Sequence, residues 1–313
     1  PEQYRSKAIS QMLYVSPCFS MFFCTFVVGF KKWDASHPIK TKSSMSKKIL
    51  FINQEITPYV PETEMSLMGY NVPLNIQEAG YEIRTFMPKW GNINERRGQL
   101  HEVIRLSGVN LIIDETDHPL IIKVASIPST RIQVYFIDND DYFMKRQMAL
   151  DENGAPYADN GQRAIFFARG VLETVKKLRW NPDIIHCQGW MAAYIPVLIK
   201  KAFKDEPAFA NTKVVTSLFN HGLEGQLGQN FKKTLEYKSI KGTVLSEFNS
   251  EFDYCELEKL AIAFSDGVIE GSEGIKQTLL DFADQKGVPV LKYPGQDFTE
   301  PYQKFYEAIY PEK

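Results

Sequence analysis

Short apolar runs alternate with longer segments of helical periodicity over most of the chain. Residues 49–52 read Ile-Leu-Phe-Ile, a continuous apolar run typical of a parallel strand that is covered on both faces. Residues 162–178 repeat apolar side chains at the spacing of one helix face. Further strands are expected at 82–87, 184–186, 213–218, 267–269 and 288–291, and further helices at 65–79, 190–203, 255–264, 271–283 and 300–310. This order predicts an α/β fold with a Rossmann-like, doubly wound and mostly parallel sheet.

The stretch between residues 101 and 137 has a different pattern. It contains four β-rich runs, at 101–106, 109–113, 120–125 and 132–137, and turn residues separate them. No helical segment lies between these runs. The pattern therefore predicts a β-hairpin-rich insertion in the sheet rather than simple strand–helix–strand units.

The first 44 residues are expected to lie outside the folded domain, which we place at 45–313. Residues 12–30 form an apolar run with basic residues on both sides, and residues 31–44 read as a polar, basic linker. Three interpretations stay open: an over-extended start with translation beginning at Met45, a hydrophobic anchor, or a flexible tail. No membrane is expected for residues 45–313, and the domain is expected to be cytoplasmic.

Composition excludes several classes of function. Asp and Glu (38) slightly outnumber Lys and Arg (36), so the net charge is −2 and binding to nucleic acid through bulk charge is disfavoured. Four cysteines and five histidines are scattered without metal-ligand spacing, so no metal and no cofactor are expected. The sparse cysteines favour a reducing compartment.

The loop after the first strand, residues 53–64, lies where open α/β sheets bind ligands. It has no glycine-rich phosphate motif. It contains two prolines and three glutamates: Pro58, Pro61, Glu55, Glu62 and Glu64. Since phosphates need free N–H donors and positive potential, this loop suits a diphosphate poorly. Thr63 is expected to cap the following helix.

Three later loops follow strands and are expected at the same edge of the sheet. His186-Cys187-Gln188-Gly189-Trp190 follows the middle strand and allows two interpretations: sugar contact, or a buried histidine with the indole packed on the sheet. Asn220 or His221 is expected to face the same cleft after residue 218. Glu270 follows the strand at 267–269, and Ser272 is expected to cap the next helix.

Several segments match motifs of one known family in order and spacing. They are KKILFINQEITPY at 47–59, the run 80–89, the run 136–143, Tyr157-Ala158-Asp159-Asn160 with Arg163, Pro182-Asp183-Ile184-Ile185-His186 with Trp190, and residues 264–268. Together they resemble the bacterial glycogen synthases and plant starch synthases that use ADP-glucose.

This resemblance implies the N-terminal, acceptor-side half of a GT-B glycosyltransferase, in which two Rossmann domains face each other. The family transfers glucose from ADP-glucose, with retention, to an α-1,4-glucan. The partners implied are therefore glycogen or another α-1,4-glucan, ADP-glucose, and either a full-length synthase or a separate C-terminal domain.

The chain departs from the family at three site elements. The donor loop K-T-G-G aligns with Pro61-Glu62-Thr63-Glu64. The second His and the Asp of H-x-H-D-W align with Gln188 and Gly189, and the His of I-H-N aligns with Phe219. No catalytic residue is assigned, and the degenerate catalytic positions are Gln188, Gly189 and Phe219. By resemblance the candidates for the sugar-binding cleft are Glu55, Tyr59, Asn160, Arg163, His186, Gln188, Trp190, Asn220 and Glu270.

These departures lead to two hypotheses about function. The first is a glycogen or starch synthase-like glucosyltransferase that is weak or inactive alone. The alternative is a non-catalytic module that binds glucan or regulates a full-length synthase or a separate C-terminal domain.

Overall fold

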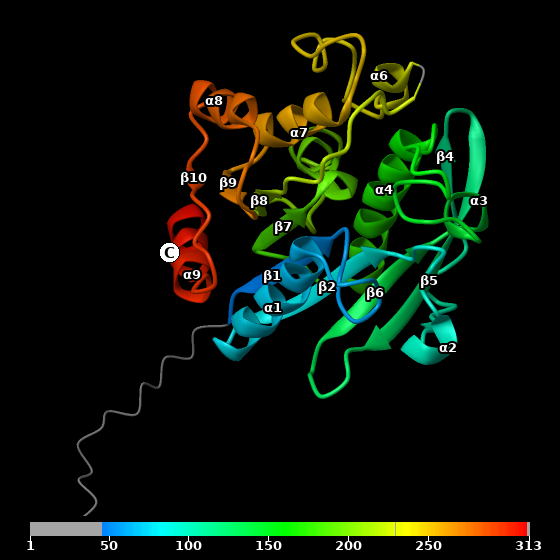
Figure 1. The fold of residues 1–313 in the computed structure, drawn as a ribbon, viewed down its shortest axis with the longest axis horizontal. Helices are drawn as coiled ribbons and strands as arrows, with labels where there is room; N and C mark the ends of the chain where they lie inside the picture. Colours follow the sequence, from blue (N-terminus) through cyan, green and yellow to red (C-terminus); the bar gives the residue numbers. More distant parts are fainter. Residues whose placement is uncertain (1–45, 229, 312–313) are drawn as a thin grey trace, which may run out of the picture. The chain divides into compact units, whose positions relative to one another are not determined.

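The computed structural model describes residues 46–228 and 230–311, and within them ten strands pair in the order β10-β9-β8-β7-β1-β2-β6-β5-β3, with β4 beside β5 (Figure 1). The apolar run 12–30, the linker 31–44 and the start at Met45 lie outside the described residues.

The parallel strands form the larger part of this sheet. They are β1 (Lys48–Asn53), β2 (Glu82–Pro88), β6 (Gln133–Asp138), β7 (Ile184–Gln188), β8 (Lys213–Leu218), β9 (Gly267–Glu270) and β10 (Val290–Leu291). Each of their mutual pairings is parallel. The prediction of a Rossmann-like, mostly parallel sheet is confirmed.

The antiparallel part of the sheet comes from the expected insertion. β3 (His101–Glu102), β4 (Val109–Ile113) and β5 (Thr116–Ser126) pair in antiparallel fashion, and β5 joins the sheet through β6. The run at 101–106 supplies only two strand residues, because Leu106 and Ser107 turn back toward Val103 through backbone hydrogen bonds.

The longer helices of the described part are α1 (Glu64–Glu78), α4 (Asn160–Leu178), α7 (Tyr254–Ala263), α8 (Gln277–Gln285) and α9 (Thr299–Ile309). Single turns occur at α2 (Glu95–Gly98), α3 (Asp140–Phe143) and α6 (Phe231–Thr234). These helices cross between parallel strands or cover the sheet, as the alternating pattern predicts.

Two expected helices differ in the structure. The helix expected at 271–283 begins only at Gln277, because Gly274 has a φ of +72° and the Ser272 hydroxyl accepts a bond from the Asn220 N–H instead of capping. The helix expected at 190–203 is divided into η1 (Trp190–Ala192), α5 (Ile195–Val197) and η2 (Leu198–Ala202). Pro196, which has no N–H to donate, lies inside this divided segment.

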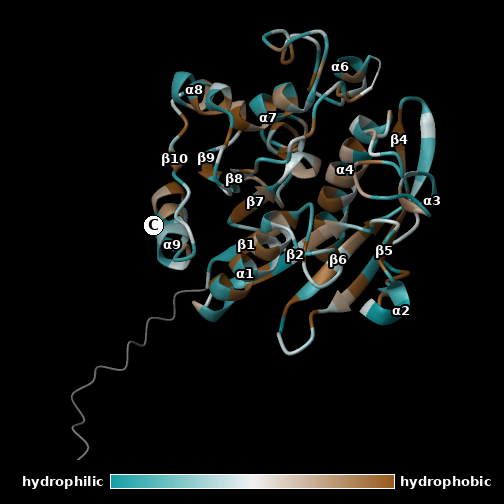
Figure 2. Cartoon of the chain, viewed as in Figure 1, coloured by the Kyte–Doolittle hydropathy of each residue, from teal (hydrophilic) through white to brown (hydrophobic). Residues whose placement is uncertain are grey.

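The two faces of β1 pack against different helices. Leu50 and Ile52 belong to the large core that includes α4 and α7, whereas Ile49 and Phe51 pack with the side chains of α1 and α9. Figure 2 shows hydrophobic colouring along the central strands and hydrophilic colouring on α2. In the described part of the chain, no helix is both long and apolar enough to cross a membrane.

Candidate functional site

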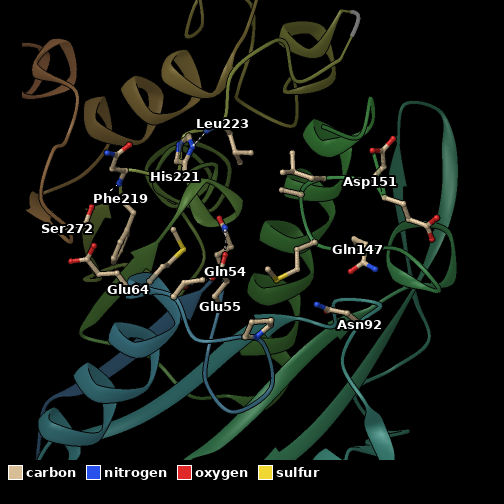
Figure 3. Close-up of a pocket in the computed structure, with 18 residues that line it drawn as sticks. Gln54, Glu55, Glu64, Asn92, Gln147, Asp151, Phe219, His221, Leu223 and Ser272 are labelled. Atoms are coloured by element: carbon tan, nitrogen blue, oxygen red, sulfur yellow. Dashed lines mark hydrogen bonds between the residues drawn. The ribbon is translucent and has the colours of Figure 1, made fainter. Parts of the chain in front are cut away.

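A cavity of about 600 Å³ lies at the carboxyl ends of β1 and β8. In Figure 3, side chains of four segments surround it: the loop after β1, the start of α1, the loop after β8, and the segment at 147–152. Its lining residues are Gln54, Glu55, Pro61, Thr63, Glu64, Met65, Asn92, Gln147, Met148, Ala149, Leu150, Asp151, Glu152, Phe219, Asn220, His221, Leu223 and Ser272. The position matches the rule for ligand sites in open α/β sheets.

The charged side chains of this lining are all acidic. Glu55 and Glu64 come from the loop after β1 and the start of α1, and Asp151 and Glu152 come from the segment at 147–152. No Lys or Arg is among the lining residues, and none of these four carboxylates is ion-paired within the described ranges. Amides and apolar side chains complete the wall. Such a lining favours neutral, hydroxyl-rich ligands over anions.

At the start of α1, side chains of the chain itself accept hydrogen bonds from the first backbone N–H groups. Thr63 caps the helix as predicted: its hydroxyl accepts from the Ser66 N–H at 3.0 Å and donates to Glu55 Oε2 at 2.7 Å. The Ser66 hydroxyl in turn accepts from the Thr63 N–H at 2.8 Å, which completes a capping box. Glu64 adds a carboxylate in the first turn. The positive end of this helix therefore already faces acceptors of the chain itself.

The loop after β8 places Asn220 and His221 at the cavity. His221 Nδ1 accepts from the Leu223 N–H at 3.0 Å, so the proton lies on Nε2, which is 3.2 Å from the buried Glu258 carboxylate. Both ring nitrogens are thus engaged within the protein. The ring lines the cavity in an orientation that these two contacts fix.

His186 lies on β7, outside the cavity lining, and its side chain is buried between the sheet and α9. Its Nε2 is 2.6 Å from the Ser217 hydroxyl, and its Nδ1 is 2.7 Å from the Tyr306 hydroxyl of α9. Burial lowers the pKa of His186 to about 3, so the ring is neutral at ordinary pH. The geometry matches the buried interpretation of this histidine.

The residues after His186 are also buried and do not line the cavity. Gln188 Oε1 and Trp190 Nε1 have no hydrogen-bond partner in the described structure, and the indole packs edge-on against Tyr254 at 5.1 Å. Gly189 has a φ of +80°. Burial raises the pKa of the Cys187 thiol well above its usual value, which opposes a nucleophilic role.

The other sequence candidates lie near the cavity in different ways. Phe219, Pro61 and Thr63 line it, whereas Glu62 lines a smaller neighbouring cavity. Tyr59 packs edge-on against Phe136 at 4.9 Å, and burial raises the pKa of its hydroxyl to about 12. Glu270 accepts from the Tyr293 N–H at 3.3 Å and does not line the cavity.

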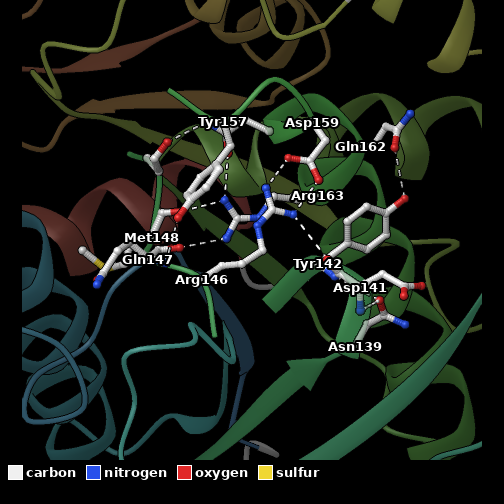
Figure 4. A network of polar contacts seen from close by, with 12 residues as sticks. Asn139, Asp141, Tyr142, Arg146, Gln147, Met148, Tyr157, Asp159, Gln162 and Arg163 are labelled. Atoms are coloured by element: carbon white, nitrogen blue, oxygen red, sulfur yellow. Dashed lines mark hydrogen bonds and ion pairs between the residues drawn. The ribbon is translucent and has the colours of Figure 1, made fainter. Parts of the chain in front are cut away.

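Asn160 and Arg163, at the start of α4, are fully buried behind the segment 147–152. Figure 4 shows their surroundings, in which Arg146 forms two hydrogen bonds of 2.6 and 2.5 Å to the carboxylate of Asp159. Neither Asn160 nor Arg163 lines the cavity. Their side chains instead donate to backbone carbonyls of the segment that does.

Sequence reasoning missed the cavity wall formed by Asn92 and by residues 147–152. This segment has no apolar periodicity and follows no strand directly, so neither periodicity nor the strand-end rule selects it. The acidic pair Asp151-Glu152 is a weak signal in a chain with 38 acidic residues. In the described residues, no group of three or more His, Cys, Asp or Glu side chains is arranged to hold a metal ion.

Comparisons with known proteins agree with the sheet and the motifs. Residues 48–290 match the family model described as starch synthase catalytic domain. A glycogen synthase of Chlorobium luteolum is 37% identical over 203 residues, which are 64% of this chain and 42% of that protein. A glycogen synthase of Chlorobaculum tepidum is 32% identical over 235 residues, 75% of this chain and 47% of that protein.

A solved structure shares the fold at low sequence identity. It is the catalytic domain of starch synthase IV from Arabidopsis thaliana bound to ADP and acarbose, with a TM-score of 0.62 and 17% identity over 79% of this chain and 51% of that one. The chain thus spans less than half the length of the curated relatives it matches. The resemblance found from the motifs is confirmed, and the chain belongs to the starch synthase catalytic domain family.

Proposed function

We propose that residues 45–313 are the acceptor-side domain of a glycogen or starch synthase-like glucosyltransferase. In this proposal the cavity binds an α-1,4-glucan, and the chain alone transfers glucose from ADP-glucose weakly or not at all. The matched relatives are named glycogen synthases, and the matched structure is bound to ADP and acarbose, which supports a glucosyltransferase ancestry for this domain.

The acidic lining of the cavity is the observation that carries the proposal. ADP-glucose presents a diphosphate, whose binding needs positive potential and free N–H donors. Glu55, Glu64, Asp151 and Glu152 give the cavity negative potential. A neutral glucan has no net charge to repel, and its hydroxyls donate to carboxylates and amides.

The capping box at the start of α1 supports the same proposal. In the resembled family this loop has a cation and two glycines, whereas here it has Pro61, Glu62, Thr63 and Glu64. The Thr63 hydroxyl accepts a hydrogen bond from the Ser66 N–H and donates one to the Glu55 carboxylate. A phosphate at this helix end has to displace a hydrogen bond and approach two carboxylates.

The proton-transfer groups of the site are also poorly available. An amide at Gln188 cannot take up a proton, and the apolar ring of Phe219 stands where the family has a histidine. His221 has both ring nitrogens engaged, and Cys187 is buried. These features support weak activity rather than efficient catalysis.

The second candidate is a non-catalytic module that binds glucan or regulates a full-length synthase or a separate C-terminal domain. The acidic cavity favours it as well, because such a module needs glucan binding and no donor site. The two candidates differ in residual transfer: a weak enzyme elongates glucan slowly by itself, whereas a module changes the rate only of another chain.

The test combines calorimetry with a transfer assay on the full chain. We expect maltoheptaose to bind, ADP-glucose to show no heat at micromolar protein, and radiolabelled ADP-glucose to give little or no elongation of glycogen. Micromolar binding of ADP-glucose with steady elongation contradicts the proposal. Absence of maltoheptaose and glycogen binding contradicts the weak enzyme and the glucan-binding module, and a regulatory module is then tested by its effect on the elongation rate of a full-length synthase.

A further inference from the structure

We infer that Arg163 is a positioning residue that fixes residues 147–152 as one wall of the cavity. The inference rests on the proposed function in one respect: it takes the cavity to be a glucan site. It changes the role of Arg163, which the sequence placed among residues that contact sugar, because the side chain is fully buried and is not part of the lining.

The side chains of Asn160 and Arg163 hold three consecutive backbone carbonyls. Arg163 donates from one terminal nitrogen to Met148 O at 2.5 Å and to Asn160 Oδ1 at 2.8 Å, and from the other to Gln147 O at 3.1 Å. Asn160 Nδ2 donates to Ala149 O at 2.9 Å. Figure 4 shows the guanidinium directed at this segment. One turn of α4 therefore fixes the backbone of the wall.

The other restraints on the wall come from the neighbouring residues 155–157. Residues 147–152 belong to no helix or regular strand, and their backbone bonds run from Asp151 N to Ala155 O and from Tyr157 N to Ala149 O, beside a bridge between Leu150 and Pro156. The Gln147 N–H also donates to the Tyr157 hydroxyl at 3.1 Å. Without Arg163, the carbonyls of Gln147 and Met148 lose these donors, and both hydrogen bonds are partly buried. A carbonyl that loses its donor in a partly buried place costs free energy unless water replaces the donor, so we expect the segment to move or to admit water.

The contacts of the guanidinium group explain why residue 163 is an arginine. Its guanidinium forms no ion pair within the described ranges, and the nearby Asp159 is engaged by Arg146. Its central carbon lies near three aromatic rings. The distances from this carbon to the ring centroids of Trp90, Phe143 and Tyr157 are 5.1, 5.4 and 5.1 Å. Burial lowers the pKa of Arg163 to about 10, so it stays charged at pH 7. A planar fork reaches two carbonyls and three rings at once, which a lysine ammonium cannot do.

The experiment uses Arg163→Lys in the full chain, with Arg131→Met as the control. Arg131 is exposed, and its side chain makes no hydrogen bond or ion pair in the described residues. Hydrogen exchange reports the wall through amides such as Asp151 and Ala155, and calorimetry reports maltoheptaose binding. The thermal midpoint reports global stability.

For Arg163→Lys we expect amide exchange in residues 147–157 to speed up by about tenfold, and the dissociation constant for maltoheptaose to rise by about tenfold. Exchange in the central strands should stay as in the wild type at a temperature well below the midpoint. This pattern separates a local positioning role from general destabilisation. For Arg131→Met we expect neither change.

The exchange data and the binding data decide separate points. Wild-type exchange in the wall of Arg163→Lys overturns the inference. Faster exchange in the wall with unchanged maltoheptaose binding supports the positioning role of Arg163 and contradicts the wall as part of a glucan site. If the wild-type chain binds no maltoheptaose, the proposed function fails, while the exchange data still decide whether Arg163 holds the wall. If Arg163→Lys does not fold, Asn160→Ala provides a second test, because it removes the bond to Ala149 O and the Asn160 Oδ1 acceptor that holds the guanidinium of Arg163. Ala149 O keeps its bond from the Tyr157 N–H, so we expect a smaller rise in exchange, and wild-type exchange in the wall overturns the inference.

Discussion

The carboxylate of Glu55 accepts a 2.7 Å hydrogen bond from the hydroxyl of Thr63, the residue that caps α1. The bond places a negative charge beside the helix end that would otherwise attract an anion. It also ties the loop after β1 to the start of α1 inside the cavity lining. This contact thus joins the cap of α1 to one of the four carboxylates that line the cavity.

Replacing Thr63 by alanine should destabilise the protein by about 1 kcal/mol, because the Ser66 N–H loses its cap. Thr63→Ser keeps the hydroxyl and should stay within about 0.5 kcal/mol of the wild type. Urea unfolding of both variants measures the difference. Equal stability of the two variants contradicts the cap as the stabilising feature.

Reversing the charge at Glu64 should improve binding of the nucleotide sugar. In Glu64→Lys we expect the dissociation constant for ADP-glucose to fall by about fivefold or more at low salt, since a repulsion becomes an attraction. Glu78→Lys, an exposed position at the other end of α1, is the control and should leave it unchanged. Equilibrium dialysis with radiolabelled ADP-glucose, at high protein concentration and two ionic strengths, measures the weak wild-type binding and the variants alike, and an equal gain in both variants points to net charge alone.

Gly69 lies where α1 touches the loop that carries Glu55. A methyl group at this position meets the Glu55 carbonyl oxygen at 2.1 Å, far inside normal contact. Gly69→Ala should therefore destabilise the protein by about 1–3 kcal/mol, even though alanine favours helices. Asn71→Ala on the same helix should change stability by less than about 0.5 kcal/mol. Thermal and urea unfolding compare the two, and a stabilised Gly69→Ala refutes the close approach.

Acid should destabilise the fold partly through His186. Burial lowers the pKa of His186 from its ordinary value of 6.5 to about 3 in the folded state. Between these two values the unfolded chain binds a proton that the folded chain does not, so stability is lost as the pH falls. The contribution of this group has a slope of up to about 1.4 kcal/mol per pH unit.

The measurement is urea unfolding at pH 7.5 and pH 5. His186→Gln should be less stable than the wild type at pH 7.5 and should lose less free energy of unfolding on acidification. His101→Gln, at an exposed position on β3, should lose as much as the wild type. The same pH dependence in all three proteins refutes a buried neutral His186.

The sheet could be predicted from the sequence because its strands are continuous apolar runs. The strand at 213–218 has the predicted bounds, and 184–186 and 267–269 are each extended by only one or two residues. The predicted start of the helix at 271–283 was wrong, since apolar periodicity could not show that Gly274 takes a left-handed backbone.

The site was less predictable than the sheet. The strand-end rule selected the loop that carries Glu55, and Asn220 or His221 after the strand at 213–218, and these three residues line the cavity. It could not select residues 147–152, because these follow no strand and are placed by contacts from Arg163 that are distant in sequence. The rule also does not predict the direction in which a side chain points. The His186 side chain is buried in the core, where its ring contacts Ser217 and Tyr306.

The boundary between β1 and β7 separates strands from the first half of the domain from strands of the second half. The strands from β1 to β6 come from residues 48–138, and the strands from β7 to β10 come from residues 184–291. The first group can associate while the chain is still being synthesised. Pairing Ile49 with Ile184 must then bring together two residues that are far apart in the sequence, and this costs chain entropy before the contacts between β1 and β7 form. The union of these two groups along a single strand pair is therefore the expected slow step in the folding of this domain.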